Sequence, residues 1–183
     1  MKTNRILCLL VALLLLLPLI SCAKRDPNIP EGFLLAENDG DYYFYYPETW
    51  ILEENGRGLV SVRVSDSDFS NVNVATYTAS NEYPTLADYI EKHFFTQFEG
   101  NFSNLTYEKN EDETPRFKIL TVDGCDALSV EYAAAFAGEE YRFRSCVISM
   151  GGYLTVITYT AKTEQYSKHL DAIDMIISNF QFK

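Results

Sequence analysis

The sequence predicts an α+β fold in which an antiparallel β-sheet is flanked by helices. Between residues 33 and 162, most segments are short β-branched or aromatic runs bounded by turn residues, as in strands joined by tight turns. Two other segments, residues 85–98 and 163–177, carry apolar side chains at helical spacing. Because strands joined by tight turns pair antiparallel, we expect the helices to pack on the sheet.

The first strands are expected in the N-terminal half of the chain. Residues 42–46 and 50–53 are interpreted as short strands on either side of a Pro-Glu-Thr turn, and residues 54–58 contain the Asn-Gly dipeptide of a tight turn. Residues 59–64 form a β-branched run. Residues 71–78 alternate polar and apolar side chains, as a half-buried strand does.

Capping and periodicity define the two helices. Thr85 is a suitable N-cap for the first helix, and Asp88 places a carboxylate in its first turn. The apolar face of this helix repeats every four residues and consists of Leu86, Ile90, Phe94 and Phe98. Gly100 is expected to end it. The second helix is expected at residues 163–177, with a buried side formed by Tyr166, Leu170, Ile173 and Ile177.

A meander of strands is expected between the two helices. Residues 101–116 are polar and are interpreted mostly as loop. Strands follow at residues 117–122, 127–135, 141–150 and 153–161, with turns at Asp123-Gly124, Ala137-Gly138 and Gly151-Gly152. Phe180 and Phe182 alternate with polar residues, which predicts a short closing strand.

Cys125 and Cys146 are predicted to remain free thiols. A tight turn around Ala137-Gly138 places Cys146 opposite Ser129, four positions away from Cys125. Four strand residues span about 13 Å, whereas the Cα atoms of bridged cysteines lie within about 7 Å. A bulge or a wider loop would reverse this prediction.

An export signal is the most specific feature of the chain. Lys2 and Arg5 precede an apolar run that ends in Leu19-Ile20-Ser21-Cys22. This pattern resembles the lipobox of bacterial lipoproteins, in which a signal peptidase cuts before a cysteine whose sulfur carries a diacylglyceryl group. A transmembrane helix needs about 20 apolar residues, and an ordinary secretory signal ends in an Ala-x-Ala-like site, so both alternatives fit less well.

We therefore expect residues 1–21 to be a lipoprotein signal peptide and Cys22 to be the lipidation site. Residues 22–31 are polar, contain two prolines, and are interpreted as a tether to a domain that spans residues 32–183. Acyl chains on Cys22 would anchor the protein in the lipid bilayer of the cell membrane, with the domain on the extracytoplasmic side.

The charge of the chain is strongly acidic. It has 26 acidic and 15 basic residues, and removal of residues 1–21 leaves 13 basic residues and a formal charge of −13. A negative field of this kind opposes contact with phosphate backbones. We therefore expect no nucleic-acid partner.

Several short motifs occur in a characteristic order along the chain: Gly32-Phe33, Tyr46-Pro47-Glu48-Thr49-Trp50, residues 68–74, residues 86–90, Asp123-Gly124, residues 152–156 and Ser178-Asn179-Phe180. Together they resemble the PsbP family, whose namesake is the extrinsic lumenal subunit of photosystem II. The resemblance covers roughly residues 33–182 and implies an α-β-α sandwich around an antiparallel sheet. It implies no catalytic chemistry, because the matching positions are turn and core residues.

The chain shows no catalytic, cofactor-binding or metal-binding pattern. Its two histidines, His93 and His169, fall on the predicted helices near the apolar faces, and we expect both to be structural. Residues 37–41 are acidic but lack the ligand spacing of an EF-hand, which favours an Asx turn. No nucleotide-binding, zinc-protease or serine-hydrolase motif is present.

Two functional hypotheses follow from these features. The first is a membrane-anchored, extracytoplasmic lipoprotein that is not an enzyme and acts as a protein-binding or assembly module, with a protein partner in addition to the bilayer. The second is a lipoprotein that binds a small ligand or a divalent cation. An enzyme would require a deep pocket that joins a histidine to acidic residues.

Overall fold

A large antiparallel sheet forms the centre of the protein. We describe a computed structural model over residues 28–56, 59–97 and 102–183. Within these residues the sheet has the strand order β3-β4-β5-β10-β9-β8-β6, and β7 pairs with β8 beside β6. The strands are β3 (Ile51–Gly56), β4 (Leu59–Arg63), β5 (Asn71–Thr78), β6 (Ser103–Tyr107), β7 (Lys118–Val122), β8 (Cys125–Phe136), β9 (Glu139–Met150) and β10 (Tyr153–Lys162).

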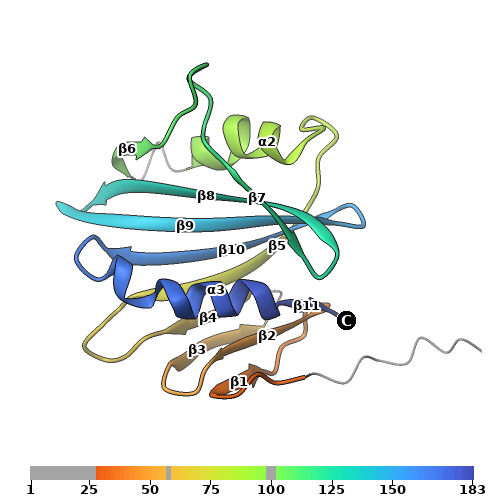
Figure 1. Ribbon diagram of the computed structural model, residues 1–183, viewed down its shortest axis with the longest axis vertical. Helices are drawn as coiled ribbons and strands as arrows, with labels where there is room; N and C mark the ends of the chain where they lie inside the picture. The colour runs from red at the N-terminus through yellow and green to blue at the C-terminus, as the bar shows by residue number, and fades with distance from the viewer. Residues whose placement is uncertain (1–27, 57–58, 98–101) are drawn as a thin grey trace, which may run out of the picture.

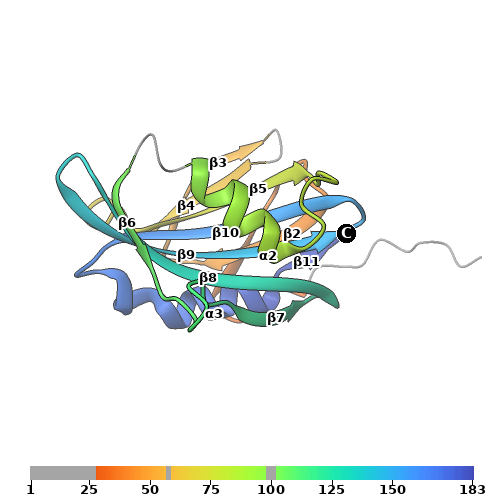
Figure 2. The ribbon, with the colours of Figure 1, turned by 90° about the horizontal axis from the view of Figure 1, so that it is seen from above.

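Helical segments cover both faces of this sheet (Figures 1 and 2). On one face, α2 (Leu86–Tyr89) continues into a π-helical turn (Ile90–Phe94) and a 3₁₀ turn (Phe95–Gln97). On the other face, a 3₁₀ turn (Tyr166–His169) leads into α3 (Leu170–Asn179). This arrangement confirms the predicted α+β class and the α-β-α sandwich.

A second, three-stranded sheet packs next to α3. Its order is β1 (Phe33–Ala36), β2 (Tyr42–Pro47) and β11 (Gln181–Phe182), and all pairs are antiparallel. The predicted strands at residues 42–46 and 50–53 are therefore real, but they belong to different sheets. The turn between them is closed by the hydrogen bond from the Trp50 nitrogen to the Pro47 carbonyl, at 2.9 Å.

Two apolar cores lie on opposite faces of the large sheet. The larger core joins the sheet to α3 and the small sheet, and it includes Phe44, Tyr159, Ile173 and Phe180. The smaller core lies under the α2 segment and is mostly aromatic, with Tyr132 stacked on Phe143 at 4.8 Å between ring centroids. Strand alternation sends adjacent residues of β9 and β10 to different cores, which explains the continuous runs of buried residues in these two strands.

Tight turns set the register of the long strands. Both residues of the three predicted turns adopt positive φ angles, namely Asp123-Gly124, Ala137-Gly138 and Gly151-Gly152. Two-residue turns of this kind match the right-handed twist of the paired strands. The resulting register places Ser129 opposite Cys146. Cys125 and Cys146 are free thiols, as predicted.

Some boundaries differ from the prediction. Residues 103–107 form β6 rather than loop, because Leu105 and Tyr107 pack against the smaller core despite their polar neighbours. Residues 54–56, predicted as part of a turn, belong to β3, and Gly56 pairs with Leu59. Phe98, Gly100, Cys22 and the predicted signal peptide lie outside the described residues, so the predictions about them remain predictions.

Candidate functional site

The two histidines contact neighbouring side chains within the fold. His169 Nε2 lies 2.9 Å from Asp68 Oδ2, and its ring packs edge-on against Trp50. His93 lies between Tyr83, whose hydroxyl is 3.4 Å from Nδ1, and Gln97, whose amide nitrogen is 2.6 Å from Nε2. Each histidine joins neighbouring elements of the fold, and neither faces a cluster of acidic side chains in the described residues.

The acidic segment at residues 37–41 forms the predicted Asx turn. The Gly40 nitrogen donates to Asn38 Oδ1 at 2.9 Å, and the Asn38 amide donates to the Ala36 carbonyl at 3.0 Å. The Lys183 ammonium then donates to the Gly40 carbonyl at 2.8 Å. These bonds account for the conformation of the segment without a bound cation.

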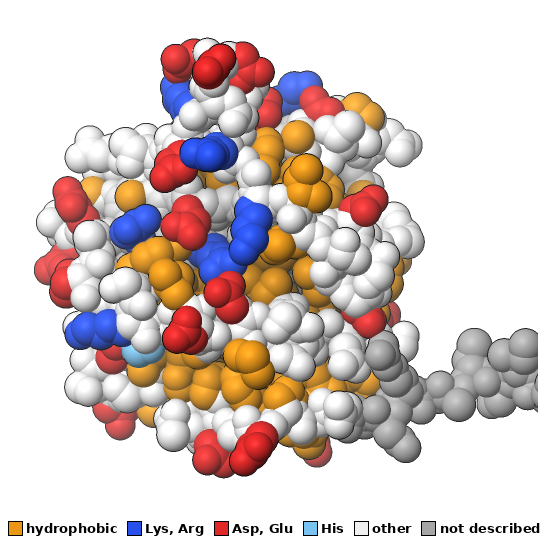
Figure 3. Space-filling view, in the orientation of Figure 1, with side chains coloured by type: hydrophobic (Ala, Val, Ile, Leu, Met, Phe, Trp, Pro, Cys, Tyr) orange, Lys and Arg blue, Asp and Glu red, His pale blue; other side chains and the backbone are white. Residues whose placement is uncertain are grey.

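A charged groove lies on the α3 face of the sheet. Figure 3 shows Lys and Arg side chains gathered near the centre of this face, beside hydrophobic side chains. The groove has a volume of about 320 Å³ and is lined by Glu108, Arg116, Phe117, Lys118, Ser129, Glu131, Arg144 and Asp174. Strand pairing positions its floor, because the β8–β9 register sets Glu131 opposite Arg144.

Arg144 is the most unusual residue of this charged groove. Its side chain is only 8% exposed, although it is a permanently charged guanidinium in the middle of β9. Its Nη2 lies 2.7 Å from Oδ1 of Asp174 on α3, whose side chain is 58% exposed. A nearly buried cation therefore depends on a carboxylate that is itself accessible to solvent.

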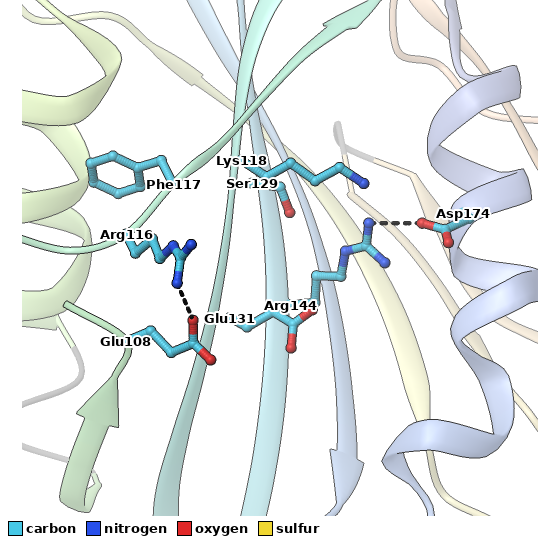
Figure 4. Close-up of a pocket in the computed structure, with 8 residues that line it drawn as sticks. All are labelled: Glu108, Arg116, Phe117, Lys118, Ser129, Glu131, Arg144 and Asp174. Atoms are coloured by element: carbon cyan, nitrogen blue, oxygen red, sulfur yellow. Dashed lines mark ion pairs between the residues drawn. The ribbon is translucent and has the colours of Figure 1, made fainter. Parts of the chain in front are cut away.

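Lys118 approaches Arg144 from the edge of the sheet. Both side chains extend toward α3, whereas Arg116 and Glu108 pair on the opposite side of the charged groove, at 3.6 Å (Figure 4). Lys118 is exposed, and among the described residues it has no ion pair. Its ammonium group is therefore available to an anion from outside.

A second hollow continues from the charged groove along β7. It has a volume of about 460 Å³ and shares Lys118, Arg144 and Asp174 with the charged groove. Its other lining residues are mainly apolar or small: Leu120, Thr121, Val122, Asp171, Met175, Ile177 and Ser178. The combined surface is elongated, with a charged end and an apolar end between β7 and α3.

This surface is suited to binding an anionic group. Guanidinium and ammonium groups form charge-assisted hydrogen bonds with carboxylates, and arginine can do so with two parallel bonds. Ser129, which is 3% exposed, also lines the charged groove. The geometry thus supports recognition of an anionic group.

An aromatic pocket lies on the opposite face, next to the α2 segment. Its volume is about 460 Å³. Its walls include Phe94, Phe136 and Tyr141, and its floor includes the cross-strand pair Asn73 and Thr158. Apolar walls with a few polar groups are typical of small-ligand sites.

Sequence reasoning missed both surfaces. Arg144 lies in a strand whose alternate residues Cys146 and Ile148 are fully buried, so its position in the alternation could have identified it as a buried charge. Its partner, Asp174, could not have been identified, because α3 is placed against β9 by tertiary packing. The predicted lipidation site, Cys22, lies outside the described residues.

No helix in the described part of the chain is long and apolar enough to cross a membrane. Within the same residues, no three His, Cys, Asp or Glu side chains gather as they do around a metal ion.

Known protein families and curated proteins show no match to this chain. Solved structures do match it. Cyanobacterial PsbP (CyanoP) from Synechocystis sp. PCC 6803 has a TM-score of 0.58 at 17% identity, over 91% of this chain and 99% of that protein. LpqN, involved in cell envelope biogenesis of Mycobacterium tuberculosis, has a TM-score of 0.53 at 11% identity, over 82% of this chain and 91% of LpqN.

A Bacteroides thetaiotaomicron protein has a TM-score of 0.52 at 12% identity, over 80% of this chain. The chain spans about half of that protein, 47% of its length. At these identities the likeness establishes architecture alone. The order of strands, the helices on both faces and the match to cyanobacterial PsbP identify the fold of this chain as PsbP-like.

Proposed function

We propose that this chain is a membrane-anchored, extracytoplasmic lipoprotein that acts as a non-catalytic binding or assembly module. The observation that carries the proposal is the charged groove. It presents the nearly buried Arg144 and the unpaired Lys118 side by side on a chain whose net charge is −11. Cations that an acidic protein holds in a groove are a specific attachment point for an anionic group.

The partner is a protein that offers an acidic side chain to the charged groove. Arg144 forms an ion pair with Asp174 and lines the charged groove. A carboxylate from the partner would bind both Arg144 and Lys118, while the net negative surface around them would reject a less precisely placed anion.

Two further features support an envelope location. The lipobox-like Leu19-Ile20-Ser21-Cys22 provides an anchor. LpqN, which has the same architecture, is described as involved in cell envelope biogenesis. A tethered domain searches for its partner close to the bilayer, which raises the effective concentration of membrane-bound partners.

The proposal is tested by affinity capture from native membranes with three variants of the full chain. Lys118→Glu reverses the unpaired charge of the groove, and we expect capture of the partner to fall by about fivefold or more, as the loss of roughly 1 kcal/mol implies. Lys92→Glu makes the same charge change on the α2 segment, where Lys92 pairs with Asp88, and should leave capture unchanged.

Cys22→Ala completes the comparison. It removes the anchor without touching the described domain, so it should lower capture by reducing partner encounter while leaving the affinity of the charged groove intact. Equal capture by Lys118→Glu and Lys92→Glu would contradict the role of the charged groove. Equal capture by Cys22→Ala would contradict the role of anchoring.

The aromatic pocket favours a second function, the binding of a small apolar ligand. Phe94 and Phe143 are almost fully buried in its wall, whereas Tyr77 and Phe136, with about half of their surface exposed, form its rim. Calorimetry with a panel of small aromatic and aliphatic metabolites distinguishes this function, because its heat signal would be unaffected by Lys118→Glu.

A further inference from the structure

The outer edge of β7 is an unpaired sheet edge that borders the second hollow. Among the described residues, β7 pairs with β8 alone, through a register that runs from Lys118–Ser129 to Val122–Cys125. Four of its five residues line the second hollow together with residues of α3. Five residues at strand spacing make this edge about 17 Å long.

The register determines which backbone groups face outward. A two-residue turn, Asp123-Gly124, joins β7 to β8, so the closing pair Val122 and Cys125 exchanges hydrogen bonds. Bonded and non-bonded pairs alternate along an antiparallel ladder. The N–H and C=O groups of Ile119 and Thr121 therefore point away from β8, toward the unpaired edge.

The side chains along this edge do little to prevent another strand from pairing with it. Ile119 is 83% exposed, more than any other large hydrophobic residue in the described part of the chain. Natural proteins usually protect such edges with charges, prolines or bulges. Within β7, Lys118 supplies a charge at one end, while Ile119 and Thr121 leave the outward backbone groups accessible.

The groove beside this edge fits a single extended strand. Leu120 and Val122 line it from β7, and Met175 and Ile177 line it from α3. Met175 is 42% exposed, and its flexible thioether can adjust to an incoming side chain. A helix would leave the outward N–H and C=O groups of β7 unpaired, whereas a strand would pair them.

We propose that the partner binds by strand addition: an extended segment pairs with the outer edge of β7, with an acidic side chain beside Lys118 and Arg144 and apolar side chains along Leu120 and Val122 on the same face and over Ile119 on the other face. This inference rests on the proposed function and names the form in which the partner is recognised. Main-chain hydrogen bonds supply affinity in this mode, and alternate side chains supply specificity. The three arginines near the charged groove, Arg116, Arg142 and Arg144, already form ion pairs within the protein. The unpaired Lys118 is therefore the group that selects an acidic side chain of the partner.

The probe is a capped heptapeptide with glutamate at its first and last positions and valine and threonine between them, titrated into the full acylated chain in detergent. We expect saturable binding, and we expect the amides of Ile119 and Thr121 to become protected from hydrogen exchange. The matching peptide with lysine in place of glutamate should bind at least tenfold more weakly, because it meets Lys118 and Arg144 with like charge.

Thr121→Pro removes one outward N–H without breaking a bond to β8, because prolines are tolerated where the strand nitrogen faces solvent. We expect it to weaken peptide binding by roughly tenfold, because one hydrogen bond is lost and the peptide carbonyl that would have accepted it is left unpaired. Thr121→Ala keeps the N–H and should bind within about twofold of the wild type. Ile119→Asp, at an exposed position, provides a second variant and should also weaken binding.

The outcomes separate this inference from the proposed function. Equal binding by Thr121→Pro and Thr121→Ala, with binding still lost in Lys118→Glu, would overturn strand addition and leave the charged groove as the attachment point. Protection of amides outside β7 would overturn it as well. Binding of the lysine peptide as tight as that of the glutamate peptide would contradict the acidic identity of the segment.

Discussion

At the scale of single residues, the pair formed by Asp68 and His169 joins two distant parts of the chain. Asp68 lies in the loop before β5, and His169 lies at the start of α3. Both side chains are less than one-fifth exposed, and Trp50 packs against the imidazole. The contact therefore links the start of α3 to the loop between β4 and β5.

The pH dependence of the free energy of unfolding should reveal the contribution of this pair. Burial alone would raise the pKa of the Asp68 carboxyl, but hydrogen bonds from Ser70 and His169 outweigh it and hold the pKa below its ordinary value. A lowered pKa means that ionised Asp68 stabilises the fold above the unfolded-state pKa of about 4, and that this stability is lost as the pH falls through the lowered value.

We therefore expect urea unfolding midpoints of the wild type to fall between about pH 5 and pH 2 more steeply than those of Asp68→Asn. Asp66→Asn is a suitable control, because Asp66 is 88% exposed and pairs with Arg63 at the surface. Identical pH profiles for the wild type and Asp68→Asn would contradict the assigned role of Asp68.

At the scale of elements, the α2 segment shows how local signals and packing combine. Thr85 is the N-cap, as predicted: its Oγ1 accepts a hydrogen bond from the Asp88 nitrogen at 3.0 Å and donates to the Asp88 carboxylate at 2.6 Å. The predicted apolar positions Ile90 and Phe94 are buried. Apolar residues at every fourth position drift around an α-helix, which has 3.6 residues per turn. The wider π-helical turn, in which the Phe95 nitrogen donates to the Ile90 carbonyl, keeps them on one face.

Removal of the cap tests this element. We expect Thr85→Ala to lower the free energy of unfolding by about 1 kcal/mol, because the Asp88 nitrogen loses its acceptor in a helix too short to be stable alone. Thr85→Ser, which keeps the hydroxyl, should remain within about 0.5 kcal/mol of the wild type. Denaturant unfolding measures both, and equal losses for the two variants would argue against capping.

At the scale of the whole molecule, the predicted anchor at Cys22 is the feature to test. We expect native protein to begin at Cys22, to carry acyl chains and to sediment with membranes, whereas Cys22→Ala should appear in the aqueous fraction. Intact-mass analysis together with membrane fractionation measures both properties. Retention of residues 1–21 without an added acyl mass would contradict the lipoprotein assignment.

Much of the fold could be predicted from sequence because its signals are local. The turns Asp123-Gly124 and Gly151-Gly152, the cap at Thr85 and the alternation of residues 71–78 each act within a few residues. β6 was missed because its burial comes from contacts with β8 and the α2 segment, which no local pattern records. The smaller sheet was missed because its strands β2 and β11 pair in space although most of the sequence separates them.

The sequence by itself determined the α+β class, most of the strand register, the two helices and the free thiols, since periodicity and turn chemistry are properties of neighbouring residues. Tertiary structure alone decided where the candidate binding surface lies. Arg144, Asp174 and Lys118 come from β9, α3 and β7, and they meet only because sheet pairing and core packing bring these elements together. Charge and shape at such a site depend on distances through space, which a linear pattern does not contain.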